Sequence, residues 1–168
     1  MMHDPNAMPN LPMLVKSFMD IGGQKTAVFN PGQATLYLGL VFEELGEFMA
    51  ALATGCITEA ERMDTLELAD GLKGCANRFK QGMQTGDMGR AAVATEEVLD
   101  GAIDLAWVAL GLVMSLSKNP AGAIAEVARA NLDKFPGGVA IRDANGKIQK
   151  PPTWRGPDLY PFMPSKDD

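Results

Sequence analysis

Two helix-forming segments are apolar on almost every side yet carry clusters of acidic residues, and this combination limits the fold. Over residues 33–54, apolar side chains recur at three- and four-residue steps along a stripe that includes Leu38, Leu45 and Leu52. Residues 91–116 form a second long apolar segment. Helices that are apolar nearly all round are usually buried. The sequence therefore predicts that both segments lie inside a helical assembly.

Three further segments show helical signals. Apolar spacing runs over residues 11–19 and stops at Gly22-Gly23, and residues 58–79 open with a capping-box pattern formed by Thr58 and Glu61. Asn119-Pro120 separates the second acidic segment from a helix over residues 121–134. The chain has no parallel-strand pattern, glycine-rich phosphate loop or internal repeat. We therefore predict an all-α fold, a bundle of about five helices.

The C-terminal segment has a different character. Residues 139–142 and 147–150 flank an Asn-Gly turn, and this pattern predicts a small hairpin. The prolines in residues 151–164 predict an extended arm. The predicted organisation is a helical domain over residues 1–135, followed by the hairpin and arm over residues 136–168.

Charge and composition exclude several functional classes. Acidic residues outnumber basic ones by 21 to 15, for a net charge of -6, so the chain lacks the basic surplus of a nonspecific nucleic-acid or anionic-membrane binder. His3 is the single histidine and lies in a loose terminus, which argues against histidine-based zinc sites and catalytic triads. Cys56 and Cys75 lack metal-binding spacing and are expected to be reduced.

The sequence predicts a cytoplasmic protein with no nucleic-acid or membrane partner. Residues 1–10 have no signal-peptide pattern, and the longest apolar run, residues 105–114, is shorter than the roughly 20 residues that span a bilayer.

The acidic clusters lack local basic partners. Glu43, Glu44 and Glu47 form an EExxE pattern away from the leucine stripe, and no Lys or Arg occurs between residues 25 and 62. Glu97, Asp100 and Asp104 fall within an arc of roughly 60° on the second segment, where no basic residue occurs between residues 90 and 118.

Clustered acids of this kind suggest a metal site. Burying several uncompensated carboxylates costs several kcal/mol per ion, which bound divalent cations would offset. Carboxylate ligands without His or Cys favour Mg²⁺ or Mn²⁺. A solvated acidic face is the alternative. Glu67 and Asp70 form a rival ExxD pair, but basic residues share their helix, so we predict a solvated face there.

Three motifs, taken in order, resemble the all-α nucleoside triphosphate pyrophosphohydrolases, the superfamily of MazG, dimeric dUTPase and phosphoribosyl-ATP pyrophosphohydrolase. They are Glu43-Glu44-x-x-Glu47, Glu97-x-x-Asp100-Gly-Ala-Ile-Asp104-Leu-Ala-Trp107, and Glu126-Val-Ala-Arg-Ala-Asn131-Leu-Asp-Lys134. The segments 143–147 and 150–159 are similar to those of the MazG-like branch. The interval between the first two motifs is longer than is usual in the family and contains an inserted helix and loop over about residues 55–89.

The resemblance implies roles for particular residues. Glu44, Glu47, Glu97 and Asp100 would bind Mg²⁺, and Glu43 would act as a further ligand or as the base that orients water. The catalytic residues would therefore be those of EExxE.

The resemblance also implies that Asn131 and Lys134 approach the substrate. Asp104 is a further candidate substrate-binding residue. Lys134 at a helix end is equally explained as a partner of the helix dipole. Trp107 either stacks on a base or belongs to the hydrophobic core. Gln24 either contacts the base or is part of a plain connecting loop.

The implied function is Mg²⁺-dependent hydrolysis of a nucleoside triphosphate, expected to be a dNTP, to the monophosphate and pyrophosphate. The implied assembly is a homodimer or a dimer of dimers. Two alternatives stay open at this point: a non-catalytic helical module that binds metal or nucleotide as a regulator, and an interaction protein whose acidic helices dock on a basic partner.

Overall fold

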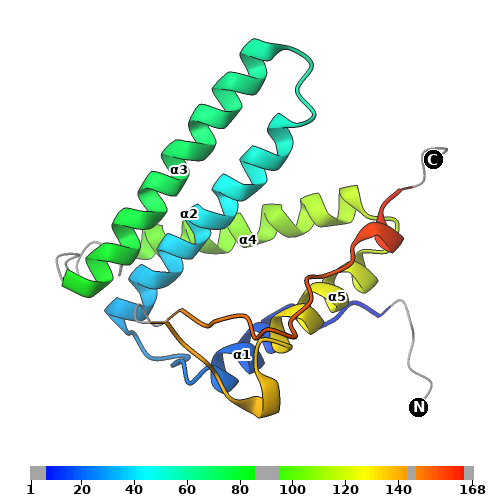
Figure 1. Cartoon of the computed structure of the whole chain (residues 1–168). Coiled ribbons are helices and arrows are strands. Elements are labelled where there is room, and N and C mark those ends of the chain that lie inside the picture. Colours follow the sequence, from blue (N-terminus) through cyan, green and yellow to red (C-terminus); the bar gives the residue numbers. More distant parts are fainter. Residues whose placement is uncertain (1–6, 86–94, 144–146, 165–168) are drawn as a thin grey trace. The chain divides into compact units, whose positions relative to one another are not determined.

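The computed structural model describes residues 7–85, 95–143 and 147–164, and Figure 1 shows its elements in order. The helices are α1 (Leu11–Ile21), α2 (Pro31–Ala53), α3 (Glu59–Thr85), α4 (Glu96–Leu116) and α5 (Pro120–Leu132), with short 3-10 turns η2 (Pro136–Gly138) and η3 (Tyr160–Phe162). Within these ranges the extended pairing amounts to one isolated antiparallel bridge, Arg142 with Ile148. The all-α prediction is confirmed.

Three helices begin with the same device. Asn10, Asn30 and Asn119 cap α1, α2 and α5, and each side-chain oxygen accepts the backbone N–H three residues later at 3.2, 3.1 and 3.0 Å. Each cap is followed by proline within the first two helical positions, where no N–H is needed. Because Pro31 starts α2, this helix begins two residues before its predicted start.

The capping box predicted at the start of α3 is present. The Thr58 N–H donates to Glu61 Oε2 at 3.1 Å, and the Glu61 N–H donates to Thr58 Oγ1 at 3.2 Å. The helix continues to Thr85, beyond its predicted end at Phe79, because Gly82 lies within the helix rather than ending it.

The chain divides into two compact units, one formed by Met1–Val28 with Leu99–Asp168 and one formed by Phe29–Val98. In the second unit α2 and α3 form an antiparallel hairpin along a line of small residues. Gly39 lies against Ala76 and Gly46 against Ala69, where an added Cβ on either glycine would be 3.1 Å from the facing carbonyl oxygen. Small residues at seven-residue intervals let the two backbones approach closely.

The buried face of α2 differs from the predicted one. Leu52 of the leucine stripe is 48% exposed, whereas the buried residues of α2 are Thr35, Leu36, Gly39, Gly46 and Ala53. Within the single chain α2 is therefore buried mainly at small residues, because these permit the closest helix packing; burial of its other sides in an assembly stays a prediction. Phe42 and Phe79 stack across the hairpin with centroids 5.3 Å apart.

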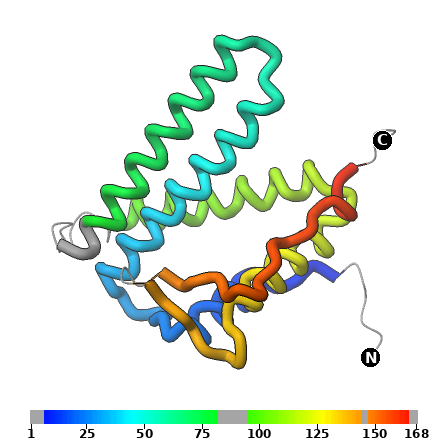
Figure 2. Tube along the Cα trace, viewed as in Figure 1, coloured from blue at the N-terminus to red at the C-terminus, as the bar shows by residue number. Residues whose placement is uncertain are grey.

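The first unit is built around α1, α5 and the C-terminal arm. Phe18 of α1 packs on the buried Phe135 just after α5, with ring centroids 4.9 Å apart. The arm, orange to red in Figure 2, runs beside the yellow α5. The predicted hairpin is reduced to a short ladder in which the Gln149 N–H donates to Ile141 O at 2.7 Å. Its Asn-Gly turn lies outside the described residues.

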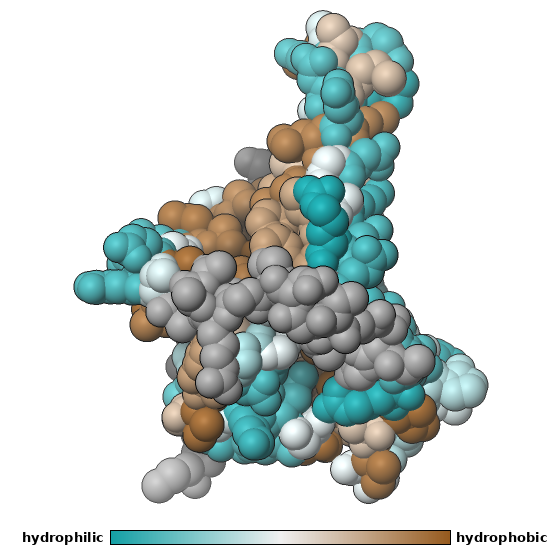
Figure 3. All heavy atoms as spheres, turned by 90° about the vertical axis from the view of Figure 1, so that its left-hand side faces the viewer, coloured by the Kyte–Doolittle hydropathy of each residue, from teal (hydrophilic) through white to brown (hydrophobic). Residues whose placement is uncertain are grey.

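The α4 helix starts at Glu96, and residues 91–94 of its predicted range lie outside the described residues. It contains no buried residue in the single chain, and its predicted burial inside an assembly stays a prediction. Figure 3 shows apolar residues, in brown, at the surface on the side of the molecule that it draws. By length and composition α4, at 21 residues, is the one helix in the described ranges that is able to cross a membrane; core helices of soluble proteins pass the same test. The apolar run of residues 105–114, from which the sequence predicts no membrane span, is only part of this longer helix. Large apolar side chains exposed along α4 are Leu99, Ile103, Leu105, Trp107, Val108, Leu112, Met114 and Leu116.

Candidate functional site

The first acid of EExxE has a basic partner on the neighbouring helix. Glu43 Oε2 lies 2.6 Å from Lys80 Nζ of α3, and the two side chains are 26% and 20% exposed. Local spacing along α2 predicted no such partner, because Lys80 is brought to Glu43 by the fold of the hairpin. Glu43 is therefore a half-buried, compensated carboxylate.

The other two acids of the motif differ from Glu43. Glu44 and Glu47 are exposed and are spaced three residues apart on α2, so their carboxylates lie on one side of the helix. The prediction that these acids are buried is wrong. Their exposure makes both accessible to an ion or a ligand from solvent.

The acidic motif of α4 lies at the start of the helix. The Thr95 hydroxyl accepts the Val98 N–H at 3.2 Å and caps the first turn. Hydrogen bonds from the backbone N–H of Glu97 and from Thr95 hold the pKa of Glu97 below its usual value. Asp100 and Asp104 follow at helical spacing and are exposed. Three carboxylates thus share one side of α4.

The two acidic motifs belong mainly to different units. Glu43, Glu44, Glu47 and Glu97 lie within Phe29–Val98, and Asp100 and Asp104 within the other unit. In the described part of the chain, no three Asp, Glu, His or Cys side chains meet as a preformed metal cluster. The donors themselves are all carboxylate oxygens, the ligand type that suits Mg²⁺.

The rival ExxD pair lies on an open face of α3. Glu67 and Asp70 are exposed, and Asp70 Oδ1 lies 3.8 Å from Lys73 Nζ with the aspartate side chain 82% exposed. This confirms the prediction of a solvated face.

Two predicted substrate-binding residues meet at the end of α5. Lys134 Nζ donates to Asn131 Oδ1 at 2.7 Å. The same ammonium lies 5.9 Å from the ring centroids of Phe18 and Trp154. The structure therefore holds Asn131 and Lys134 as a pair beside two aromatic rings.

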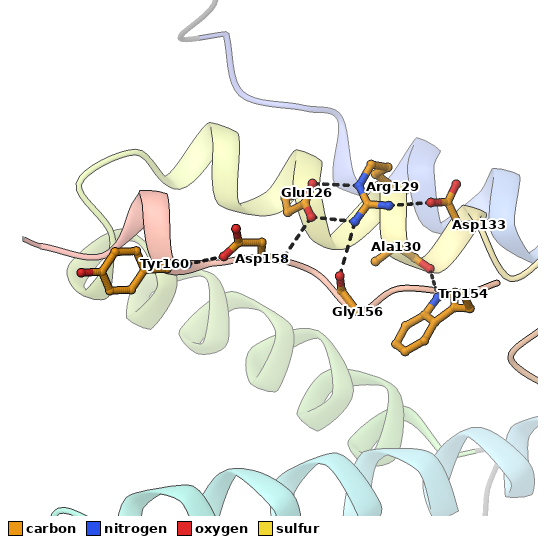
Figure 4. Close-up of polar contacts among 8 residues, drawn as sticks. All are labelled: Glu126, Arg129, Ala130, Asp133, Trp154, Gly156, Asp158 and Tyr160. Carbon is orange, nitrogen blue, oxygen red and sulfur yellow. Dashed lines mark hydrogen bonds and ion pairs between the residues drawn. The ribbon is translucent and has the colours of Figure 1, made fainter. Parts of the chain in front are cut away.

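The arm places two further residues, Trp154 and Lys150, beside this pair. The Trp154 indole N–H donates to Ala130 O at 2.5 Å, as Figure 4 shows, and Lys150 Nζ lies over the indole at 4.3 Å from its centroid. Their spacing within the segment 150–159 was the available sequence signal, but it gave no indication of which ring the lysine would contact.

A polar network fixes the arm to α5. Arg129 donates two hydrogen bonds to the Glu126 carboxylate at 2.9 and 2.7 Å, and the backbone N–H of Asp158 donates to the same carboxylate at 3.0 Å (Figure 4). These donors lower the pKa of Glu126 to about 2. Arg129 also contacts Asp133 at 2.5 Å and Gly156 O at 3.5 Å.

Trp107 and Gln24 were the weaker candidates. Trp107 is 76% exposed on α4, so its placement in a core is wrong and its ring is accessible. Gln24 is half-buried in the loop after α1, and its N–H donates to Met19 O at 2.8 Å.

Comparison with known proteins adds no relative: no protein-family model, curated protein or solved structure matches this chain.

Proposed function

We propose that the chain is a divalent-metal-dependent nucleoside triphosphate pyrophosphohydrolase that converts a nucleoside triphosphate, with a dNTP as the expected substrate, to the monophosphate and pyrophosphate. The observation that carries the proposal is the pair of exposed carboxylate motifs. Glu44 and Glu47 on α2, and Glu97 and Asp100 on α4, are each spaced three residues apart on a helix. The ordered motifs of the sequence support the same reading.

The chemistry of the donor set fits Mg²⁺, with Mn²⁺ as a substitute. All four side chains offer hard oxygen donors, and within the described residues none of them forms an ion pair with Lys or Arg that would have to break. A bound divalent cation would neutralise phosphate charge and acidify the attacking water. We assign Glu44, Glu47, Glu97 and Asp100 as the residues that hold it.

Glu43 is the proposed base that orients the attacking water. Its ion pair with Lys80 restrains the carboxylate, and a restrained base loses less freedom when it takes up the reactive geometry. Lys80 is in this account a positioning residue.

Substrate contacts are proposed at five further positions. Asn131 and Lys134, joined by a hydrogen bond, offer an amide and an ammonium to phosphate oxygens. The exposed ring of Trp107 offers a stacking surface for a base, with Asp104 one turn earlier on α4. Gln24 remains a candidate contact to the base.

We further propose a homodimer or a dimer of dimers. The support is that eight large apolar side chains are exposed on α4 in the single chain, since extensive exposed apolar surface marks interaction sites. Light scattering should give about twice the chain mass of 17.9 kDa or a higher multiple.

The experiment is a panel of NTPs and dNTPs incubated with Mg²⁺ and scored for monophosphate and pyrophosphate. The proposal predicts both products from at least one nucleotide. Mg²⁺-dependent nucleotide binding without turnover would instead indicate a regulatory module.

A further inference from the structure

The tip of the C-terminal arm is bound to the turn that connects α4 with α5, residues 117–119. The carbonyl oxygen of Phe162, in η3, accepts two hydrogen bonds there. The Lys118 N–H donates to it at 3.1 Å and the Ser117 hydroxyl at 2.9 Å. In Figure 4 the short helix that holds Tyr160 lies beside this turn. One carbonyl of the arm thus takes donors from two successive residues of the turn.

The Phe162 ring lies on a glycine at the start of α5. A Cβ added to Gly122 would be 2.5 Å from Phe162 Cε1 and 3.0 Å from its Cδ1, so the half-buried ring occupies the place of a side chain. The Gly122 N–H in turn donates to Asn119 Oδ1 of the turn at 3.0 Å. We refer to the contacts of Phe162 with Ser117, Lys118 and Gly122 as the latch.

The direction of α4 depends on this connection. In the single chain α4 contains no buried residue, whereas Ala121, Ile124 and Ala130 of α5 are buried. Packing within the unit therefore holds α5 in place but restrains α4 only weakly. The turn and the latch are consequently the contacts that set the angle between the two helices.

The acids of α4 lie far from the turn. Asp100 is 16 residues before Leu116, the last residue of α4, and this separation is about 24 Å at the helical rise per residue. A tilt of about 10° at the turn therefore moves Asp100 by about 4 Å. Mg²⁺ binds its ligands at about 2 Å and demands near-ideal geometry. A small change of angle at the turn is thus large at the carboxylates.

We propose that Phe162 is a positioning residue, which locks the turn between α4 and α5 and so fixes where α4 places Asp100 and Asp104. The inference rests on the proposed function, in which these carboxylates serve the metal and the substrate. Phe162 itself contacts neither and acts through the turn. The tip of the arm thereby contributes to the reaction from the opposite end of α4.

Spin labels on the two helices measure the direction of α4 independently of any reaction. The labels are attached at Ile103→Cys on α4 and Ala125→Cys on α5, both exposed positions, after serine has replaced Cys56 and Cys75. Labelled chain is refolded with an excess of unlabelled chain, so that distances between subunits do not contribute. Pulsed dipolar electron spin resonance should give one narrow distance distribution for the parent.

Two substitutions open the latch from opposite sides. Phe162→Ala removes the ring, and Gly122→Ala fills its seat while favouring the helix, so it tests the latch even if Phe162→Ala fails to fold. Each should broaden the distance distribution. In unlabelled chains each should also lower kcat for nucleotide hydrolysis about 100-fold, a loss typical of an ångström-scale misplacement, with a much smaller change in KM.

Conservative and matched variants complete the comparison. Phe162→Leu refills most of the seat and should restore both the narrow distribution and most of kcat. Tyr160→Ala is the matched control, because it lies in the same 3-10 turn with its side chain 86% exposed, and it should behave as the parent.

The outcomes separate the latch from the proposed function. Distances unchanged by Phe162→Ala and Gly122→Ala, broadening with unchanged kcat, or equal broadening by Tyr160→Ala would overturn the role of Phe162. Broadening by both latch variants in a chain that hydrolyses no nucleotide would support the locked turn and reject the pyrophosphohydrolase.

Discussion

Lys80 of α3 places its ammonium 2.6 Å from the Glu43 carboxylate of α2, so the first acid of EExxE is tied to the partner helix. The pair lies beside a close approach of the two helices, because an added Cβ on Gly39 would be 2.9 Å from Lys80 Cγ and 3.1 Å from Ala76 O. The lysine stem therefore packs over the glycine while its head group pairs with the glutamate. The position of this candidate catalytic side chain depends on the packing of the hairpin.

The ion pair should contribute to stability. Lys80→Met keeps the stem but leaves Glu43 half-buried without its cation, and we expect a loss of about 1–3 kcal/mol in the free energy of unfolding. Lys73→Met removes an exposed pair with a 3.8 Å separation and should cost less than about 0.5 kcal/mol. Urea unfolding measures both. Equal effects of the two substitutions would show that the Glu43 pair adds nothing specific.

Close packing of α2 on α3 makes a second prediction. In Gly46→Ala the new methyl would be 3.1 Å from Ala69 O, so we expect a net loss of about 1–3 kcal/mol despite the better helix propensity of alanine. Gly71→Ala on α3 meets nothing within 4 Å and should stabilise the protein by up to about 1 kcal/mol. Thermal unfolding distinguishes the two signs, and stabilisation by Gly46→Ala would contradict the close approach.

The elements of the fold were predictable where a local signal exists. Thr58 and Glu61 correctly predict the start of α3, and Gly22-Gly23 correctly predict the end of α1. Both signals work because helix capping depends on residues within one turn of the helix end. The packed face of α2 was not predictable from hydrophobic periodicity. Periodicity favours the leucine stripe as the packed face, but Gly39 and Gly46 permit a closer contact with α3. Whether that contact forms depends on the small residues Ala69 and Ala76, which lie opposite the two glycines on α3.

Acid should loosen the arm from α5. The pKa of Glu126 is lowered to about 2 from a reference of 4.5, chiefly by its hydrogen bonds from Arg129. A carboxyl group whose pKa is lower in the folded than in the unfolded chain stabilises the folded state at pH values above its unfolded pKa. That stabilisation is lost as the pH falls from about 4.5 to about 2. Glu126→Gln should therefore show a smaller loss of stability across this window than the parent in urea titrations. Glu67→Gln, an exposed control, should follow the parent.

Arg129 should control access to the arm. Its contacts with Glu126, Asp133 and Gly156 O hold the segment that contains Arg155, a trypsin site. Arg129→Gln should accelerate trypsin cleavage after Arg155, measured by mass spectrometry at neutral pH. Arg62→Gln, which removes an exposed pair with Glu59 in the other unit, should leave that rate unchanged. Slow cleavage in both variants would show that the arm is held by other contacts.

The candidate site was predictable in its residue types and less so in its surroundings. Carboxylates at three-residue spacing on two helices are visible in the sequence, whereas the hydrogen bond from Lys134 to Asn131 is not. The Lys80 partner of Glu43 and the Lys150 contact with Trp154 arise from segments far apart in sequence. Such contacts follow from tertiary packing, which local patterns do not specify.

The most direct test of the central claim is pyrophosphate release in Mg²⁺ by variants of the two competing ExxD pairs. Glu97→Gln and Asp100→Asn should each reduce turnover at least about 100-fold, as loss of a main electrostatic element commonly does, while Glu67→Gln and Asp70→Asn should remain close to the parent. Excess EDTA should abolish turnover. Undiminished release in EDTA, no release from any nucleotide, or the reverse ranking of the two pairs would contradict the account.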